Sequence, residues 1–269
     1  VFIQLPPTPA LYIVATYCKI TGSKLVADCH NAMIYSRWLR WPLAKALLRR
    51  ADIALVHNRD VEVYAKRFNL NTITLRDPLP VLEAPGQSDL LDRIGVNDNP
   101  YIIVPWSFSP DEPIGELVQA ATALPEITFI MTWFAERLPQ DVRNSLPPNL
   151  VLSGYLDDED FNALFSKSIA ALVLTTREGT QPSAASEAIV LGIPLIVSDL
   201  NTTRQLYDDM PVYTKNTSEG IREAAQEIVD NRDRYQSKVA AFKNDFARRL
   251  DQEIQEVKSK LGLMGADKT

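Results

Sequence analysis

The chain of 269 residues is 46% hydrophobic, which is enough apolar material for one large or two ordinary globular domains. Its net charge of −6 argues against a nucleic-acid partner, because binding to phosphates requires a strongly basic surface. The two cysteines exclude a disulfide framework and lack the spacing of a metal site, and no apolar run approaches the roughly 20 residues that span a bilayer, so we expect a cytoplasmic protein without a metal cofactor.

Short β-branched runs alternate with helical stretches through residues 1–90. Strands are expected at 1–3, 25–27, 53–56 and 72–75, and helices at 10–21, 42–51 and 60–68. This alternation is typical of βαβ units around a parallel sheet and predicts a Rossmann-like domain. Because the first strand has nothing before it to initiate it, we expect this domain to be incomplete by two or three βα units of about 30 residues each.

The segment 35–50 concentrates positive charge within an acidic chain. It contains no acid, and its charged and tryptophan residues are Arg37, Trp38, Arg40, Trp41, Lys45, Arg49 and Arg50. This composition is typical of an interfacial segment that contacts anionic lipid. It is equally compatible with a solvated basic face whose tryptophans fill the core, so both interpretations stay open.

A polar, proline-bearing stretch from Asp77 to Pro100 separates the first alternation from a second one and marks the expected domain boundary. Strands are expected at 101–104, 127–131, 150–152, 170–174 and 195–197, and helices at 112–123, 158–167, 184–191 and 202–207. They predict a doubly wound domain over 98–217. Residues 218–262 are expected to form two long amphipathic helices that pack back across the domains, rather than a coiled-coil partner.

The loop 175–183 follows the expected strand that ends at Leu174, and open α/β sheets bind ligands at that end of a strand. Pro182 and Ser183 mark a helix start, whose first-turn amides and dipole suit a diphosphate. Glu187, one turn further on, is placed to accept hydrogen bonds from ribose hydroxyls. The same pattern occurs in α/β proteins whose carboxylates are merely solvated, so the residue types alone leave both readings open.

The residues of this region resemble the donor-binding signature of the family 4 and group 1 glycosyltransferases of the GT-B fold. The matching residues are Arg177-Glu178-Gly179-Thr180, Glu187-Ala188 and Gly192-Ile193-Pro194. The resemblance covers most of residues 98–200 and implies two Rossmann-like domains facing a cleft. It also implies that Glu178 contacts the donor sugar, while the donor is bound by Ser107, Arg177, Gly179, Thr180, Ser183, Ala184 and Glu187.

Two departures from that family are visible. Eight residues separate Glu178 from Glu187, where the family has seven, and the Arg and Lys that usually follow the first strand of the donor domain are absent. Their place reads Trp-Ser-Phe-Ser-Pro-Asp-Glu over 106–112, which is similar to the enzymes that add the first mannose to dolichol-linked chitobiose. We therefore expect Ser107, Ser109 and either Arg177 or Arg204 to stabilise the departing diphosphate.

The resemblance to the dolichol-linked enzymes extends to residues 4–7 and 24–31 and implies an active-site role for His30. His30 follows an expected strand, and we predict that it contacts the donor sugar or the acceptor hydroxyl, where it is suited to act as a base. His57, after the next strand, is predicted to have a packing role.

Together these observations predict a glycosyltransferase that moves a sugar from a UDP- or GDP-sugar to a carbohydrate or lipid-linked acceptor, such as a polysaccharide precursor, at the inner face of a membrane. One alternative is a catalytically silent GT-B subunit that partners an active transferase, and another is a sugar-nucleotide epimerase. No Gly-x-Gly-x-x-Gly occurs, which argues against a dinucleotide oxidoreductase. The sugar, the linkage and the oligomeric state are not indicated by the sequence.

Overall fold

The computed structural model describes residues 1–82, 88–96 and 99–263. The chain forms two compact units, which are described separately here. The first unit comprises Val1–Pro78 and Asp245–Thr269, and the second comprises Leu79–Asn244. Within the described residues, no helix combines the length and the apolar character that a membrane span requires.

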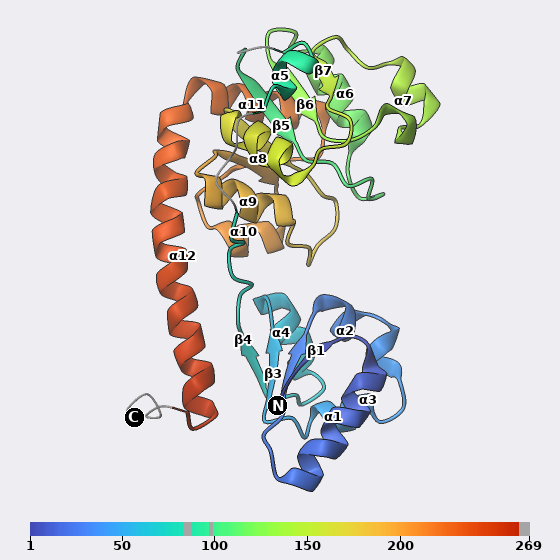
Figure 1. Ribbon diagram of the computed structural model, residues 1–269, viewed down its shortest axis with the longest axis vertical. Helices are drawn as coiled ribbons and strands as arrows, with labels where there is room; N and C mark the ends of the chain where they lie inside the picture. Colours follow the sequence, from blue (N-terminus) through green and yellow to red (C-terminus); the bar gives the residue numbers. More distant parts are fainter. Residues whose placement is uncertain (83–87, 97–98, 264–269) are drawn as a thin grey trace. The chain divides into compact units, whose positions relative to one another are not determined.

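The first unit is built on a parallel sheet whose strands follow one another in chain order (Figure 1). The strands are β1 (Phe2–Leu5), β2 (Val26–Cys29), β3 (Ile53–Val56) and β4 (Thr72–Thr74). The connecting helices are α1 (Thr8–Thr21), α2 (Asn31–Tyr35), η1 (Arg37–Arg40), α3 (Ala44–Leu48) and α4 (Arg59–Lys66). Because right-handed crossovers that always advance in one direction put their helices on one face, these helices bury a common face of the sheet.

The opposite face of this sheet is covered from the far end of the chain. Val26, Ile53, Leu55 and Ile73 pack against Val257 and Leu261 at the end of α12 (Arg232–Lys260). Arg76, just after β4, donates from its backbone N, Nε and Nη2 to the Glu253 carboxylate, with distances of 2.7 to 2.9 Å. A segment nearly 200 residues away in sequence therefore completes the core of the first unit.

The second unit contains a six-stranded parallel sheet in the order β10-β9-β8-β5-β6-β7. The strands are β5 (Tyr101–Val104), β6 (Thr128–Met131), β7 (Leu150–Leu152), β8 (Ala170–Val173), β9 (Leu195–Ser198) and β10 (Val212–Thr214). The chain winds outward from β5 to β7, then returns to β8 on the other side of β5. This reversal creates a crevice at the carboxyl ends of β5 and β8, where doubly wound sheets bind ligands.

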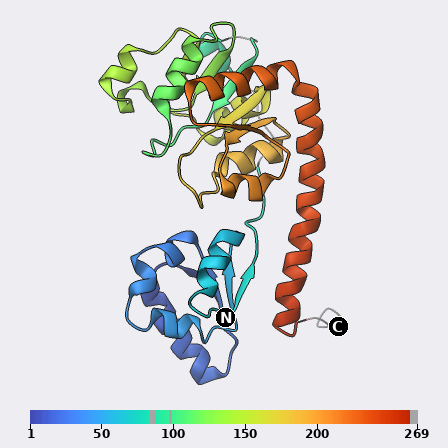
Figure 2. The same cartoon turned by 180° about the vertical axis from the view of Figure 1, so that it is seen from behind.

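Helices cover both faces of this sheet. They are α5 (Leu90–Arg93), α6 (Ile114–Thr122), η2 (Ala135–Arg137), α7 (Gln140–Asn144), α8 (Asp158–Lys167), α9 (Ser183–Leu191), α10 (Asn201–Tyr207) and α11 (Ser218–Asp230). In the second unit, α8 and α9 lie in front of the sheet in Figure 1, whereas the green α6 and the orange α11 lie in front in Figure 2. Alternate residues of each strand point to opposite faces of the sheet. Ile102 and Val104 of β5 point to the face that α6 and α11 cover.

The expected strands and the long C-terminal helices are confirmed. The short helices α2, η1, α5, η2 and α7 were not predicted, and three further details differ. The helix expected at 42–51 is only α3, because Leu43 has a left-handed φ of 59° and breaks it from η1. The helix expected from residue 112 begins at Ile114. Pro113 precedes it, and the Glu112 carboxylate accepts a hydrogen bond from the backbone N of Ser107 in the loop before the helix. Strand β10 was missed, because three residues after Pro211 give too short a run to show a period.

Candidate functional site

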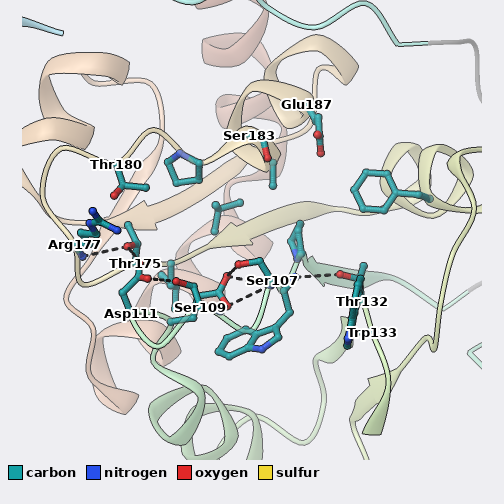
Figure 3. Close-up of a pocket in the computed structure, with 18 of the residues that line it drawn as sticks. Ser107, Ser109, Asp111, Thr132, Trp133, Thr175, Arg177, Thr180, Ser183 and Glu187 are labelled. Carbon is teal, nitrogen blue, oxygen red and sulfur yellow. Dashed lines mark hydrogen bonds between the residues drawn. The ribbon is translucent and has the colours of Figure 1, made fainter. Parts of the chain in front are cut away.

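A pocket of about 390 Å³ opens at the carboxyl ends of β5, β6 and β8 in the second unit, next to the crevice between β5 and β8 (Figure 3). Its size lies in the range of small-molecule sites. Of the residues expected to bind a donor or its diphosphate, Ser107, Ser109, Arg177, Thr180, Ser183, Ala184 and Glu187 line it. The fold thus brings together residues that are up to 80 positions apart in sequence.

The amino end of α9 forms one side of this pocket. Ser183 is the first residue of the helix, and the N-cap is Pro182, with no side chain capping the first turn among the described residues. The helix start expected at Pro182 and Ser183 is confirmed, and Pro182 has the extended backbone of a cap, at φ −67° and ψ 130°. An uncapped helix start leaves amide N–H groups and the positive end of the dipole available to an anion.

Glu187 extends from the same helix beside Ser183, on the side of the pocket opposite the loop that carries Ser107 (Figure 3). The described part of the chain offers it no hydrogen bond and no ion pair. Burial raises the pKa of the Glu187 carboxyl above its usual value, and nothing nearby compensates. A half-buried carboxylate without a partner is costly, and hydroxyl groups of a ligand would relieve that cost.

Glu178 is used differently, and it does not line the pocket. Its carboxylate accepts hydrogen bonds from the backbone N of Asn201 at 3.0 Å, and from the backbone N and Oγ1 of Thr202 at 3.1 and 2.9 Å. Partial burial acts to raise the pKa of Glu178, but these bonds outweigh it and hold the pKa below its usual value. Glu178 therefore fixes the loop 175–183 to the start of α10. Gly179, at φ 76°, donates its N–H to Thr202 Oγ1.

The loop is also fixed at its beginning. The buried Ser198 hydroxyl accepts from the backbone N of Thr175 at 2.9 Å and donates to Asn216 Oδ1 at 2.7 Å, while Asn216 Nδ2 donates to the Thr175 carbonyl at 2.9 Å. This ring of bonds joins the ends of β8 and β9 to the turn after β10. The pocket floor is thus held by residues on three neighbouring strands.

Carboxylates occupy the loop after β5. Glu112 accepts from the backbone N and Oγ of Ser107, the latter at 2.8 Å, and from the backbone N of Ser109 at 2.9 Å. Asp111 accepts from the hydroxyls of Ser109 and Thr175. Burial raises the pKa of Glu112 despite the bonds from Ser107 and Ser109, whereas the bonds from Ser109 and Thr175 lower the pKa of Asp111. The hydroxyls expected to meet a diphosphate are engaged with the loop's own acids.

The two candidate cations are placed apart. Among the described residues that line the pocket, Arg177 is the single cation, and its side chain is exposed. Arg204 instead pairs with Asp199, with 2.9 Å between Nη2 and Oδ2, and lies over the Tyr213 ring at 4.3 Å. Arg204 does not line the pocket, so Arg177 is the better placed of the two to meet a bound anion.

Aromatic side chains of Trp133, which follows β6, and of Phe161 line the pocket and form an aromatic wall that was not anticipated from the sequence. Trp133 has a φ of 125°, rare for a residue with a side chain, and its backbone pairs with Gly154 through bonds of 3.2 and 3.0 Å. The indole Nε1 atoms of Trp106 and Trp133 are buried without a hydrogen-bond partner among the described residues. Strained backbone is typical of functional sites. The positive φ at a residue other than glycine marks the position of Trp133, and no sequence pattern predicts such a φ.

A second cluster of titratable groups lies in the first unit and contains both histidines. His57, after β3, lies 2.8 Å from Asp28 Oδ1 through Nε2 and 2.9 Å from Asp77 Oδ1 through Nδ1. Burial alone would lower the pKa of His57, but the two carboxylates raise it to about 10. The two carboxylates favour the protonated ring, which adds an electrostatic contact to the packing role predicted for His57.

His30 is the outer member of this cluster. Its ring centroid lies 4.6 Å from that of His57, its Nε2 is 2.6 Å from Gln4 Nε2, and 39% of its side chain is exposed. Ligand atoms of Asp28, His30 and His57 lie within 4.8 Å of one another and are able to hold a divalent ion. The proton on His57 competes with such an ion, since a metal needs a neutral imidazole.

The two parallel sheets, of which the second is doubly wound, and the long C-terminal helix define an α/β protein of the GT-B fold. No family model and no curated protein sequence matches the chain.

Solved structures similar to the chain include HepE from Anabaena in complex with UDP, with a TM-score of 0.73 and 17% identity over 97% of this chain and 78% of that one. Sucrose-phosphate synthase from Thermosynechococcus elongatus has a TM-score of 0.64 and 15% identity over 96% and 74% of the two chains. A UDP-N-acetylglucosamine 2-epimerase has a TM-score of 0.63 and 12% identity over 98% and 73%. At these identities the similarity defines the fold.

Proposed function

We propose that the protein is a glycosyltransferase that binds a nucleotide sugar in the pocket of the second unit. One observation carries the proposal: the uncapped start of α9 and the carboxylate of Glu187, which has no partner among the described residues, line the same pocket beside the sheet's switch point. The first offers a site for phosphates and the second a site for hydroxyls. The UDP complex of HepE and the resemblance of residues 177–194 to the family 4 signature support it.

In this proposal the amides of Ser183 and Ala184 hold the diphosphate, and Glu187 accepts hydrogen bonds from the ribose. Arg177 and Thr180 line the pocket at the end away from Glu187 in Figure 3, and they add a positive charge and a hydroxyl. Charge develops on the diphosphate as the glycosidic bond breaks, so the helix dipole and Arg177 stabilise the transition state more than the ground state. Glu178 acts as a positioning residue for this loop.

The nucleobase is assigned to the aromatic wall. Trp133 and Phe161 line the pocket together with Gly154, and they supply apolar surface and a close approach of backbone. UDP and GDP are both compatible with such a wall. On the acceptor side we propose that His30, which ends the β2 segment and is partly exposed, acts as the base for a carbohydrate or lipid-linked acceptor hydroxyl.

A thermal-shift comparison of UDP, GDP, ADP and their sugar conjugates tests the donor site. A ligand at one hundred times its dissociation constant adds about 2.7 kcal/mol of stability. We expect one nucleotide class to stabilise the protein and Glu187→Ala to remove most of that effect. Glu126→Gln, an exposed change in a turn of the same unit, is the control and should leave the shift intact.

The two alternatives give different results in the same set of assays. The acids Asp111 and Glu112 stand where the family has cations, which favours a silent partner subunit. No shift with any nucleotide would support that role and reject the donor site. The shared fold with a UDP-N-acetylglucosamine 2-epimerase favours the third possibility, which interconversion of UDP-sugar epimers without an acceptor would establish.

A further inference from the structure

The segment that contains η1 and α3 is anchored in the first unit and also presents large apolar side chains outward. Leu39, Ala44 and Leu48 are buried in the core of that unit, while Trp41 is 40% and Leu43 70% exposed. Leu43 adopts a left-handed φ of 59°, a conformation that favours glycine, yet the position carries a branched apolar side chain. Trp38 is partly buried against the core, so the two tryptophans have different roles.

The cations of this segment are not neutralised by acids. Within the described residues, none of Arg37, Arg40, Lys45, Arg49 and Arg50 forms an ion pair with a carboxylate. Instead, their contacts are with aromatic rings or backbone: Lys45 Nζ lies 4.4 Å from the Phe68 ring centroid, and Arg49 Nε donates to the Phe68 carbonyl at 2.8 Å. Several arginines elsewhere, such as Arg76, Arg93 and Arg222, are paired with carboxylates.

A hollow lies in the middle of these cations. Its volume is about 430 Å³, and it is lined by Leu39, Arg40, Trp41, Leu43, Lys45, Ala46 and Arg49. Three positive charges around an apolar floor suit a phosphate that is attached to an apolar group. A free inorganic anion would gain no binding energy from the exposed apolar side chains of Trp41 and Leu43.

The neighbouring helix α1 adds apolar surface. Ile13, Tyr17 and Ile20 recur at helical spacing and are 74%, 54% and 79% exposed. The hydroxyl of Tyr12, on the preceding part of the helix, bonds to the Pro42 carbonyl and so ties α1 to the basic segment. Exposed apolar groups flanked by unpaired cations are typical of surfaces that lie in the headgroup region of a bilayer.

We propose that this basic apolar patch, defined as Arg37, Arg40, Trp41, Leu43, Lys45, Arg49 and Arg50, docks the first unit on an anionic lipid bilayer, with a lipid phosphate in the hollow. Trp41 and Leu43 enter the interface, and the cations meet the headgroups. The occupant is argued from charge: the patch is strongly positive on a chain of net charge −6, so an anionic surface is attracted to this face and repelled elsewhere. The proposal does not depend on the donor site.

Vesicle co-sedimentation of the full chain tests it, using phosphatidylcholine vesicles with and without phosphatidylserine. We expect binding only to the anionic vesicles, and weaker binding as salt is raised. Each cation is worth about fivefold in affinity near such a surface. The triple variant Arg40→Gln, Lys45→Gln, Arg49→Gln should therefore bind about 100-fold more weakly, and Trp41→Ala with Leu43→Ser should weaken binding even at high salt.

The matched control removes the same number of charges from the second unit and α12, with Arg222→Gln, Arg234→Gln and Arg248→Gln, which leave the patch intact. It should bind like the parent chain. Binding lost equally in both triple variants, or no binding to anionic vesicles, overturns the proposal. Self-association in the absence of vesicles that only the patch variant abolishes would also overturn it and make this face a protein interface. Unchanged thermal unfolding of the variants confirms that they fold.

Discussion

At the scale of single residues, Glu178 in the loop after β8 and Glu187 on α9 differ in how their charges are satisfied. Glu178 receives three hydrogen bonds at the start of α10, whereas Glu187 receives none from the described residues and has a raised pKa because of burial. Their similar sequence context hides this difference. The first carboxylate stabilises the fold, whereas the second is the one proposed to bind a ligand.

This difference predicts opposite effects on stability. Glu178→Ala should lower the free energy of unfolding by about 1–2 kcal/mol, as expected for the loss of a helix cap. Glu187→Ala should leave it unchanged or raise it, because it removes a buried acid that has no partner. Urea unfolding of both variants measures this, and equal destabilisation by the two changes would contradict the assignment.

His57 makes the free energy of unfolding depend on pH. Its pKa is raised from 6.5 to about 10 in the folded state, although burial acts in the opposite direction, because Asp28 and Asp77 hold the imidazolium. A raised pKa contributes stability that is complete below pH 6.5 and is lost as the pH rises toward 10. The Cys29 thiol, whose pKa burial raises from 9.0 to about 12, adds its own loss only above pH 9.0. The interval from 6.5 to 9.0 therefore reports on His57.

We expect the unfolding free energy to fall through that interval by up to about 1.4 kcal/mol per pH unit. His57→Gln should flatten the slope, since glutamine does not titrate, and His30→Gln should keep it. Urea midpoints of the three proteins at several pH values give the comparison. A parental slope that survives in His57→Gln would show that another group is responsible.

At the scale of elements, sheet order determines which strand ends meet. The pocket of the second unit lies where β5 and β8 are neighbours, although 65 residues separate the end of β5 from the start of β8. In the first unit, β2, β3 and β4 are consecutive neighbours, so Asp28, His57 and Asp77 come together at one edge of the sheet. Both sites follow from parallel strands ending on the same side.

Elements also show where local patterns are sufficient. The buried runs 101–104, 170–173 and 195–198 are continuous and apolar, as expected of strands covered on both faces, and the structure confirms them. Short elements such as α3 and β10 escaped prediction in part or entirely, because a few residues carry no resolvable period.

At the scale of the whole molecule, the first unit depends on the last helix. Val257 and Leu261 cover Val26, Ile53 and Leu55, which a four-stranded sheet with its helices on one face would otherwise expose. This face of the first sheet is therefore covered only after residues 257–261 have been synthesised. The first unit accordingly consists of two segments that lie far apart in the sequence.

Disrupting this contact should destabilise the first unit. We expect Val257→Asp with Leu261→Asp to increase hydrogen exchange of the amides in β2 and β3, because a charge replaces apolar surface on the sheet. Lys260→Asp, an exposed change on the same helix, is the control and should leave exchange unchanged. Exchange measured by mass spectrometry separates the two cases. Unchanged protection in the double variant would show that the helix end is dispensable.

The sequence by itself determined the α/β class, all strands of the two sheets except β10, the long C-terminal helices and the loop 175–183, because strand runs, turn residues and helix starts are local. Only the tertiary structure decided that Glu178 caps α10, that His57 is held between Asp28 and Asp77, and that Trp133 faces Gly154 across the pocket edge. These contacts join residues 20 to 29 positions apart. Their partners depend on sheet order and packing, for which no local pattern exists.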